Sequence, residues 1–221
     1  MKTLTTRANT SGFTLIELLV VICVIAVLAA VLLPAHSGPS RATRVVCMSH
    51  LKQIDLGFYL YAEDYGGKFP MQVSVMNGGT MEFIYSGHAF PHFEKLRKYM
   101  NESQPFTMLV CPSDKSRQAA TNYEALNDMN VSYFLNADAC HTNNPSQTFF
   151  AGDRNLKSNG QTVGPGLLMV ATNVDLNWSG ELHLRGGNLA FADGHVEWSK
   201  TNELNSVIQH QLLATNHIVV P

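Results

Sequence analysis

The sequence FTLIELLVVICVIAVLAAVLL, residues 13–33, decides how this chain is organised. It carries one formal charge, Glu17, and a short leader with two basic residues and no acid precedes it. About 20 apolar residues in a helix are enough to span a hydrocarbon core of roughly 30 Å. A secretory signal peptide has a shorter apolar core that ends at a small-residue cleavage site. We therefore expect a membrane-spanning helix over residues 13–34.

The composition excludes two broad classes of protein. The 221 residues are 45% hydrophobic and 14% charged, with a net charge of −2. A weakly acidic chain is not expected to bind nucleic acid by neutralising phosphates. Disorder is not expected either, because this apolar content can form a core. Residues 13–34 hold much of the apolar excess and only one charge, so the remainder is expected to be a more polar extracytoplasmic part.

Glu17 is the most informative residue of the apolar segment. A carboxylate within a membrane helix costs about 2.5–3.5 kcal/mol, so it needs a partner unless it lies at the interface. The surrounding sequence is Gly12-Phe13-Thr14-Leu15-Ile16-Glu17. With the apolar run that follows, it resembles the prepilin family, which comprises type IV pilins and the pseudopilins of type II secretion.

The resemblance implies roles for three residues. A prepilin peptidase would cut after Gly12, the last residue of the leader 1–12. Phe13 would become the N-methylated N-terminus, and Glu17 would be the assembly residue. The new α-amino group of a neighbouring subunit could neutralise Glu17 inside the bilayer, because a paired buried charge is tolerated where an isolated one is not.

The resemblance also implies partners and a location. The partners would be other pilin or pseudopilin subunits, in homo- or hetero-polymers, together with the peptidase and an inner-membrane assembly platform. The chain would cross the inner membrane once, with a cytoplasmic N-terminus and a periplasmic head. Pro34 would either kink a longer helix, as in many pilins, or end the membrane helix.

Residues 35–67 are expected to form an amphipathic stem helix. Its apolar positions recur at spacings of three and four, as on one helix face: Cys47, Leu51, Ile54, Phe58, Tyr61 and Tyr65. Ser40 is the expected N-cap, and Gly66-Gly67 is the expected helix end. We expect the stem to pack on a globular head, with a coiled coil as the alternative.

Residues 68–221 are expected to form a β-rich head, because short apolar runs alternate with Gly, Asn and Pro turn signals. The expected elements are strands at 131–135, 148–151 and 167–170, a short helix at 92–100 and a hairpin at 188–198. Asp193-Gly194 is the expected two-residue turn of that hairpin. The expected fold class is α+β and pilin-like, with a long N-terminal helix packed on an antiparallel sheet.

A second resemblance connects the stem with the head. Three motifs are similar to those of a pseudopilin-like group abundant in planctomycetes and related bacteria: the stem sequence 47–70, CPSD at 111–114 with AGDR at 151–154, and His183 followed after nine residues by Asp193-Gly194. We interpret Asp193-Gly194 as a turn and His183 as a residue that packs or hydrogen-bonds against the hairpin.

Metal binding is the alternative interpretation of the C-terminal motif. His183, Asp193 and His195 could in principle hold a divalent ion. Calcium is considered because some major pseudopilins bind it near the C-terminus, but no oxygen-rich ligand cluster is evident. We expect no cofactor.

The four cysteines differ in their surroundings. Cys23 lies inside the apolar run and is expected to pack there. Cys47, Cys111 and Cys140 would face an oxidising compartment, where disulfides persist. We favour Cys47 with Cys111, which would join stem and head, but Cys140 could pair instead or stay free.

The sequence therefore predicts a structural protein, a subunit of a type II secretion pseudopilus or a related type IV pilus-like filament. Two alternatives belong to other classes. A membrane-anchored binding module for carbohydrate or another surface ligand would use Trp178 and Trp198 as an exposed platform. An enzyme is not expected, because no nucleophile elbow, phosphate loop or HExxH helix is present.

Overall fold

The computed structural model describes residues 12–32, 39–100, 106–141, 144–171, 173–184, 186–209 and 215–221. The chain divides into two compact units, Met1–Ser37 and Gly38–Pro221. The helices are α1 (Leu15–Leu32), α2 (Pro39–Asp64), α3 (Phe90–Glu94) and α4 (Leu204–Gln209). Pro34, the predicted kink, lies outside the described residues. Within the described ranges, no helix combines the length and the apolar character needed to cross a membrane.

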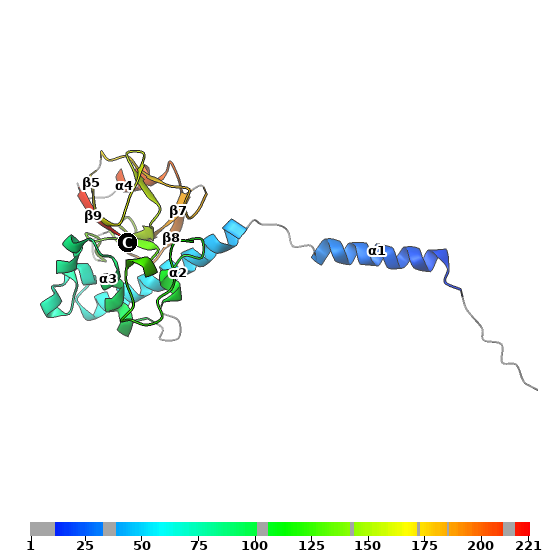
Figure 1. The fold of residues 1–221 in the computed structure, drawn as a ribbon, viewed down its shortest axis with the longest axis horizontal. Helices are drawn as coiled ribbons and strands as arrows, with labels where there is room; N and C mark the ends of the chain where they lie inside the picture. Colours follow the sequence, from blue (N-terminus) through cyan, green and yellow to red (C-terminus); the bar gives the residue numbers. More distant parts are fainter. Residues whose placement is uncertain are drawn as a thin grey trace, which may run out of the picture. The chain divides into compact units, whose positions relative to one another are not determined.

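The second unit contains two antiparallel sheets (Figure 1). The strands are β1 (Tyr133–Asn136), β2 (Phe149–Asp153), β3 (Leu156–Ser158), β4 (Gln161–Thr162), β5 (Gly166–Ala171), β6 (Leu176–Trp178), β7 (Gly186–Phe191), β8 (Val196–Lys200) and β9 (Thr215–Val220). The large sheet has the order β5-β9-β1-β2-β7-β8, and the small sheet has the order β4-β3-β6. The predicted α+β class with an antiparallel sheet is thus confirmed, and β1, β2, β5 and the β7–β8 hairpin overlap the predicted strands.

The stem helix α2 begins at Pro39 and ends just before Gly66-Gly67, and both boundaries suit these residue types. Proline suits the first helical position, because its missing N–H would have no partner there. Ser40 is therefore not the N-cap that the sequence predicted. At the other end, Gly66 and Gly67 both have positive φ, and the Gly67 N–H donates to the Ala62 carbonyl at 2.8 Å. The predicted stop at Gly66-Gly67 is confirmed.

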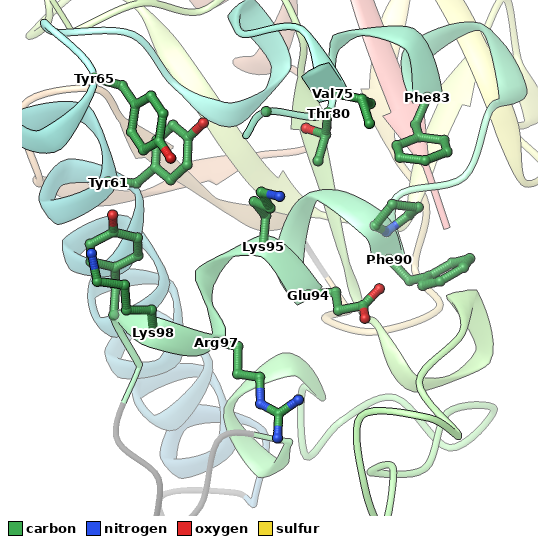
Figure 2. A pocket seen from close by; sticks show the side chains of 13 residues that line it. Tyr61, Tyr65, Val75, Thr80, Phe83, Phe90, Glu94, Lys95, Arg97 and Lys98 are labelled. Atoms are coloured by element: carbon green, nitrogen blue, oxygen red, sulfur yellow. The ribbon is translucent and has the colours of Figure 1, made fainter. Parts of the chain in front are cut away.

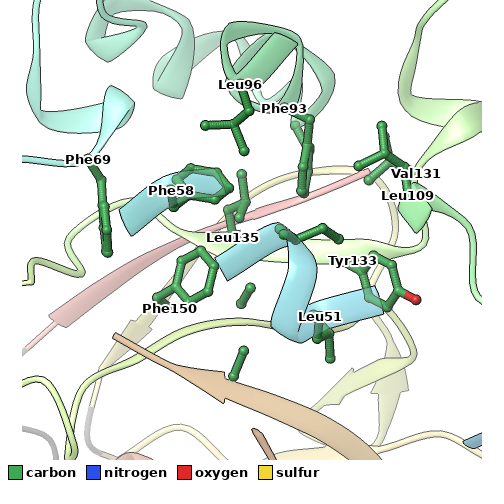
Figure 3. Packing of buried hydrophobic residues seen from close by; sticks show 14 of the residues in the cluster. Leu51, Phe58, Phe69, Phe93, Leu96, Leu109, Val131, Tyr133, Leu135 and Phe150 are labelled. Atoms are coloured by element: carbon green, nitrogen blue, oxygen red, sulfur yellow. The ribbon is translucent and has the colours of Figure 1, made fainter. Parts of the chain in front are cut away.

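The apolar seam of α2 packs on the large sheet, so the coiled-coil alternative is wrong. Cys47, Leu51, Ile54 and Phe58 have no exposed surface. They belong to a core cluster that includes residues of α3 and of strands β1, β2 and β7. Figure 3 shows Phe58 among the rings of Phe69, Phe93 and Phe150, with centroid separations of 5.7, 6.0 and 5.0 Å.

A second core cluster covers the other face of the large sheet. It combines side chains of β1, β2, β7 and β9 with Leu156 of β3, Trp178 of β6 and Leu204 of α4. Figure 1 shows α2 and α3 on one side of the large sheet and α4 on the other. The small sheet and α4, which the sequence analysis missed, thus complete the burial of the central strands, which are covered on both faces.

Six short 3₁₀ helices lie between the described elements of the second unit: η1 (Pro70–Gln72), η2 (Val75–Asn77), η3 (Met81–Ser86), η4 (Lys95–Lys98), η5 (Thr107–Leu109) and η6 (Asp128–Asn130). The predicted helix at 92–100 is instead α3 followed by η4. Pro91 in the first turn of α3 is tolerated, because N–H groups there lack intrahelical acceptors.

The predicted hairpin is present, but its turn differs from the prediction. The Phe191 N–H donates to the His195 carbonyl, and the Gly194 N–H donates to the Phe191 carbonyl, both at 3.0 Å. The loop therefore has three residues, Ala192-Asp193-Gly194, with Gly194 at φ +92°. This is the turn plus one-residue bulge that suits three-residue hairpins. The two-residue turn is wrong because Ala190 pairs with Val196.

Candidate functional site

The predicted processing site lies just before α1. Gly12 and Phe13 are exposed and precede the first helical residue. The Thr14 hydroxyl and backbone N–H donate to Glu17 Oε2 at 2.7 and 2.8 Å, and the Glu17 N–H donates to Thr14 Oγ1 at 3.4 Å. These reciprocal hydrogen bonds form a capping box. Glu17 thus stabilises the start of α1 within its own chain.

The surface of α1 is apolar on every side. Large exposed side chains on this helix include Leu15, Ile16, Leu19, Ile22 and Ile25. A helix that is hydrophobic all round requires an apolar environment, which lipid or neighbouring helices can supply.

A buried centre lies where the stem joins the head. Cys47 of α2 and Cys111 form a disulfide across 64 positions of sequence, with Cα atoms 5.2 Å apart. This is the pairing that the sequence analysis favoured, and Cys140 and Cys23 are free. His183 Nε2 lies 3.6 Å from Cys111 Sγ. His, Cys, Asp and Glu side chains can bind metal ions. Within the described part of the chain, one trio of them has ligand atoms all within 4.8 Å of one another: Cys47, Cys111 and His183.

Asp153 and Asn188 extend this centre. Asp153 Oδ2 accepts hydrogen bonds from the Asn188 N–H at 2.7 Å and from Asn188 Nδ2 at 2.9 Å, and it lies 3.4 Å from His183 Nε2. Burial raises the pKa of Asp153 to about 7, although the hydrogen bonds from Asn188 oppose this rise. Burial, with the positive charge of Arg44, lowers the pKa of His183 to about 4. Both shifts favour the neutral forms of the pair.

An ion pair joins the two four-residue motifs of the head. Arg154 donates from Nε to Asp114 Oδ2 at 2.7 Å and from Nη2 to Asp114 Oδ1 at 2.9 Å. The hydroxyl of Ser132 also donates to Asp114, at 2.9 Å. Because bidentate arginine–carboxylate pairs are directional, this contact fixes CPSD against AGDR. Cys111, from the first motif, and Asp153, from the second, then both lie beside His183 in the buried centre.

The last motif is divided between two places. His183 precedes β7, whereas Asp193 and His195 lie in and beside the loop after it. Six residues of extended strand, about 20 Å, separate the two positions. His183, Asp193 and His195 therefore do not form one set of metal ligands. His183 instead contacts the hairpin through Trp198, with ring centroids 5.7 Å apart.

The hairpin loop lies against the stem at Asp55. A Cβ atom at Gly194 would be 3.1 Å from Asp55 Oδ2, so the backbone approaches this carboxylate closely. Burial, reinforced by the negative charge of Asp193, raises the pKa of Asp55 to about 7. Burial opposes a fall in the pKa of Asp193, but hydrogen bonds from the backbone and ring of His195 lower it. The two neighbouring carboxyl groups therefore have pKa values shifted in opposite directions, with that of Asp55 raised and that of Asp193 lowered.

A cleft of about 810 Å³ lies beside the C-terminal half of α2. Its aromatic and charged lining residues are Tyr61, Tyr65, Phe83, Phe90, Glu94, Lys95, Arg97, Lys98 and Tyr99. The rings of Tyr61 and Tyr65 stack at 4.1 Å. Figure 2 shows Lys95 between this tyrosine pair on one side and Phe83 and Phe90 on the other. The cleft combines flat apolar faces with three cations and one carboxylate.

The predicted tryptophan platform is wrong. Trp178 is 2% exposed, because it belongs to the second core cluster. Trp198 is half-buried, and the guanidinium of Arg44 lies 4.5 Å over its ring. The two indoles therefore do not offer an exposed binding surface.

Sequence reasoning missed several residues of these sites. The capping box could have been found from the pattern Thr14-x-x-Glu17 before an apolar run. Asp153 lies in the AGDR motif, but Asn188 gave no comparable signal, because only the pairing of β2 with β7 brings it beside Asp153. The cleft had no linear signature, since its lining comes from several short helices and their links between residues 75 and 99, which pack beside the end of α2.

Comparison with known proteins identifies the N-terminal segment. Residues 7–33 match the family described as "Prokaryotic N-terminal methylation motif". Neither a curated protein nor a solved structure matches the chain. The motif match includes Gly12, Phe13 and Glu17 and supports a relationship with the type IV pilin and pseudopilin family.

Proposed function

We propose that this protein is a structural subunit of a pilus-like filament, either a type II secretion pseudopilus or a related type IV pilus-like fibre. The observation that carries the proposal is the methylation motif at residues 7–33. This motif indicates a structural subunit that polymerises with other pilin-like subunits rather than an enzyme. A prepilin peptidase cuts between Gly12 and Phe13, and Phe13 is then N-methylated.

Residues 13–34 anchor the subunit in the inner membrane, with the head on the periplasmic side. The support is the apolar sequence 13–33 with its single charge and the exposed apolar side chains of α1, among which Glu17 is the one charged group. In the filament, the α-amino group of a neighbouring Phe13 pairs with Glu17, which makes the register of α1 part of assembly. An inner-membrane platform with its ATPase adds subunits at the base.

The head belongs, in this proposal, to the pseudopilin-like group with the C-terminal histidine and Asp-Gly motif. Support comes from the convergence of Cys47, Cys111, Asp153 and His183 on one buried centre. The motifs of the group then have a shared structural role, which is to hold the stem on the head.

Mass spectrometry of the full-length protein, expressed with a prepilin peptidase and extracted from membranes, tests the proposal. We expect N-methyl-Phe13 as the first residue of the mature chain. A chain that retains Met1, or that begins after residue 30 or 35, would contradict it. Carbonate extraction of the same membranes should leave the protein in the pellet, and release into the supernatant would contradict anchoring.

The assembly role of Glu17 has its own test. Glu17→Gln should still be processed but should enter sheared filaments far less than the wild type, because it removes the charge that pairs with the neighbouring amine. Glu63→Gln, on the exposed face of α2, is the matched control and should assemble normally. Equal assembly of Glu17→Gln and the control would refute the role of Glu17.

The cleft supports a second function, the binding of an acidic carbohydrate by the anchored head. Tyrosine faces suit sugar C–H groups, and Lys95, Arg97 and Lys98 suit sugar carboxylates. Titration with oligogalacturonate should give saturable binding that Tyr65→Ala weakens and neutral oligosaccharides do not reproduce. Tyr85→Ala, 80% exposed and outside the cleft lining, is the control. Equal loss in both variants would reject the cleft as the binding site.

A further inference from the structure

The buried centre contains polar atoms that the protein leaves without partners. Asp153 and Asn188 have no exposed surface, and His183 is 2% exposed. Asp153 Oδ1, His183 Nδ1 and Asn188 Oδ1 nevertheless have no hydrogen-bond partner. Buried polar atoms without partners are costly and rare in folded proteins. Two of these residues also direct a second polar atom toward one another, His183 Nε2 and Asp153 Oδ2, which lie 3.4 Å apart beside the disulfide.

Two distances within the centre match those of a tetrahedral metal site. Zinc bonds of about 2.3 Å to sulfur and about 2.0–2.1 Å to nitrogen or oxygen place sulfur and nitrogen ligands about 3.6 Å apart, and nitrogen and oxygen ligands about 3.4 Å apart. Cys111 Sγ lies 3.6 Å from His183 Nε2, and His183 Nε2 lies 3.4 Å from Asp153 Oδ2. The bonded pair of sulfur atoms is closer than two zinc ligands would be, because the disulfide joins them. Asp153 lies outside the trio whose ligand atoms are all within 4.8 Å of one another, so its carboxylate would approach the sulfur atoms when the metal binds.

We propose that Cys47, Cys111 and His183, with Asp153 as the fourth ligand, bind Zn²⁺ when the disulfide is reduced. The same residues would then form two alternative cross-links, a disulfide under oxidising conditions and a zinc site under reducing ones. This inference does not depend on filament assembly. Zinc is the expected metal, because two thiolates, an imidazole and a carboxylate in tetrahedral geometry suit this redox-inert ion.

The conversion is a two-electron reduction followed by proton displacement. A dithiol reductant gives two electrons and two protons to the Cys47–Cys111 bond and itself becomes a disulfide. The S–S bond breaks, and two thiols form. Zn²⁺ then replaces the two thiol protons and the proton of any neutral Asp153, all of which pass to solvent, and binds the thiolates and the carboxylate.

The surroundings of the centre suit the zinc form. Two thiolates, a carboxylate and Zn²⁺ together carry one negative charge, and Arg44, which lies over Trp198 beside His183, can offset it. The hydrogen bonds from Asn188 hold the Asp153 carboxylate in position, as hydrogen-bond partners behind metal ligands commonly do. Since Cys47 belongs to α2 and Cys111 to the head, zinc would keep the stem attached when no disulfide is present.

Cobalt spectroscopy tests the proposal. The full-length protein in detergent micelles is reduced with a phosphine, freed of metal with a chelator and titrated with Co²⁺ without oxygen. We expect thiolate charge-transfer bands and tetrahedral d–d bands that saturate at one equivalent and disappear when Zn²⁺ is added. Zn²⁺ should also raise the melting temperature of the reduced protein. The oxidised protein should show none of these effects.

Variants identify the ligands. Cys111→Ser and His183→Ala should lose the saturating spectrum, and Asp153→Asn should bind roughly 10–100-fold more weakly. Cys140→Ser, which changes a free cysteine, should behave like the wild type. The melting temperature of oxidised His183→Ala, in which the disulfide can still form, shows whether that variant folds.

Two results would overturn the proposal. One is the absence of tetrahedral bands in the reduced wild type. The other is a spectrum that depends on Cys140 or survives in Cys111→Ser. Alkylation of the reduced protein gives an independent check if His183→Ala fails to fold: Zn²⁺ should slow modification of Cys47 and Cys111 but not of Cys140, and equal rates with and without Zn²⁺ would contradict the site.

Discussion

At the residue scale, carboxylates show how position decides chemistry. Glu17 lies on an exposed helix end and caps the backbone of Thr14. Asp55, in contrast, lies on the stem outside its apolar seam, yet it is 5% exposed, because the hairpin loop covers it. One of its oxygens, Oδ1, has no hydrogen-bond partner. A buried carboxylate of this kind makes the free energy of unfolding depend on pH.

Asp55→Asn should stabilise the second unit at pH 8. The pKa of Asp55 is raised to about 7 in the folded protein. Between its ordinary value and pH 7 the folded state holds a proton that the unfolded chain has released, so stability falls as pH rises through this range. Asparagine stays neutral, and it should raise the free energy of unfolding at pH 8 by on the order of 1–3 kcal/mol.

Denaturant unfolding at pH 5 and pH 8 measures this effect. The gain should be smaller at pH 5, where Asp55 is already protonated. Asp153 shifts in the same direction, so the variant should reduce the pH dependence of the wild type without abolishing it. Asp64→Asn, on the exposed end of the same helix, should give no gain at pH 8, because Lys98 and Tyr99 stabilise the charged carboxylate. Equal gains in both variants would refute the burial argument.

At the element scale, α2 forms one side of the hydrophobic core of the head. Its buried seam supplies one side of the first core cluster, and the large sheet supplies the other. Phe58 is the central side chain of this contact, since its ring meets three other phenylalanine rings edge-on. Edge-to-face pairs add stability beyond the area that they bury.

Phe58→Ala should destabilise the second unit by about 3–5 kcal/mol, because it leaves a cavity among rings that cannot collapse freely. Chemical denaturation of the oxidised protein measures the loss. Leu56→Ala on the same helix is the control, since Leu56 is 55% exposed and should change stability by less than about 1 kcal/mol. A comparable loss at Leu56 would contradict the packing explanation, because alanine is the better helix former at both positions.

At the scale of the whole molecule, the Cys47–Cys111 disulfide closes a long covalent loop between the stem and the head. It joins the beginning of the stem to the segment after η5, 64 positions later. Between these points lie α3, η4 and the cleft, so the bond limits how far this part of the head can open when the chain unfolds.

Cys47→Ser with Cys111→Ser should lower the free energy of unfolding by about 4 kcal/mol in the chain-entropy account of a loop of this length. Thermal or urea unfolding under oxidising, metal-free conditions measures the change. Cys140→Ser should have little effect, because Cys140 forms no disulfide. A double variant as stable as the wild type would show that packing around Cys47 and Cys111 alone holds stem and head together.

The sequence by itself determined the features that depend on neighbours along the chain. Local spacing and backbone preference are enough to predict four features. These are the apolar run 13–33, the helical recurrence of apolar residues in the stem, the end of the stem at Gly66-Gly67 and the hairpin at 188–198. The methylation motif that contains Gly12 and Phe13, the proposed processing residues, belongs to the same class, since it is linear.

Only the tertiary structure decided which distant residues share a site. It separated His183 from Asp193 by the length of β7, buried Trp178 beneath the large sheet and placed Asp153 beside Asn188 through strand pairing. It also formed the cleft from α2, η2, η3, α3 and η4. The physical reason is that local preference fixes backbone conformation within a few residues, whereas burial and pairing between distant segments depend on how the elements pack, which no local pattern encodes.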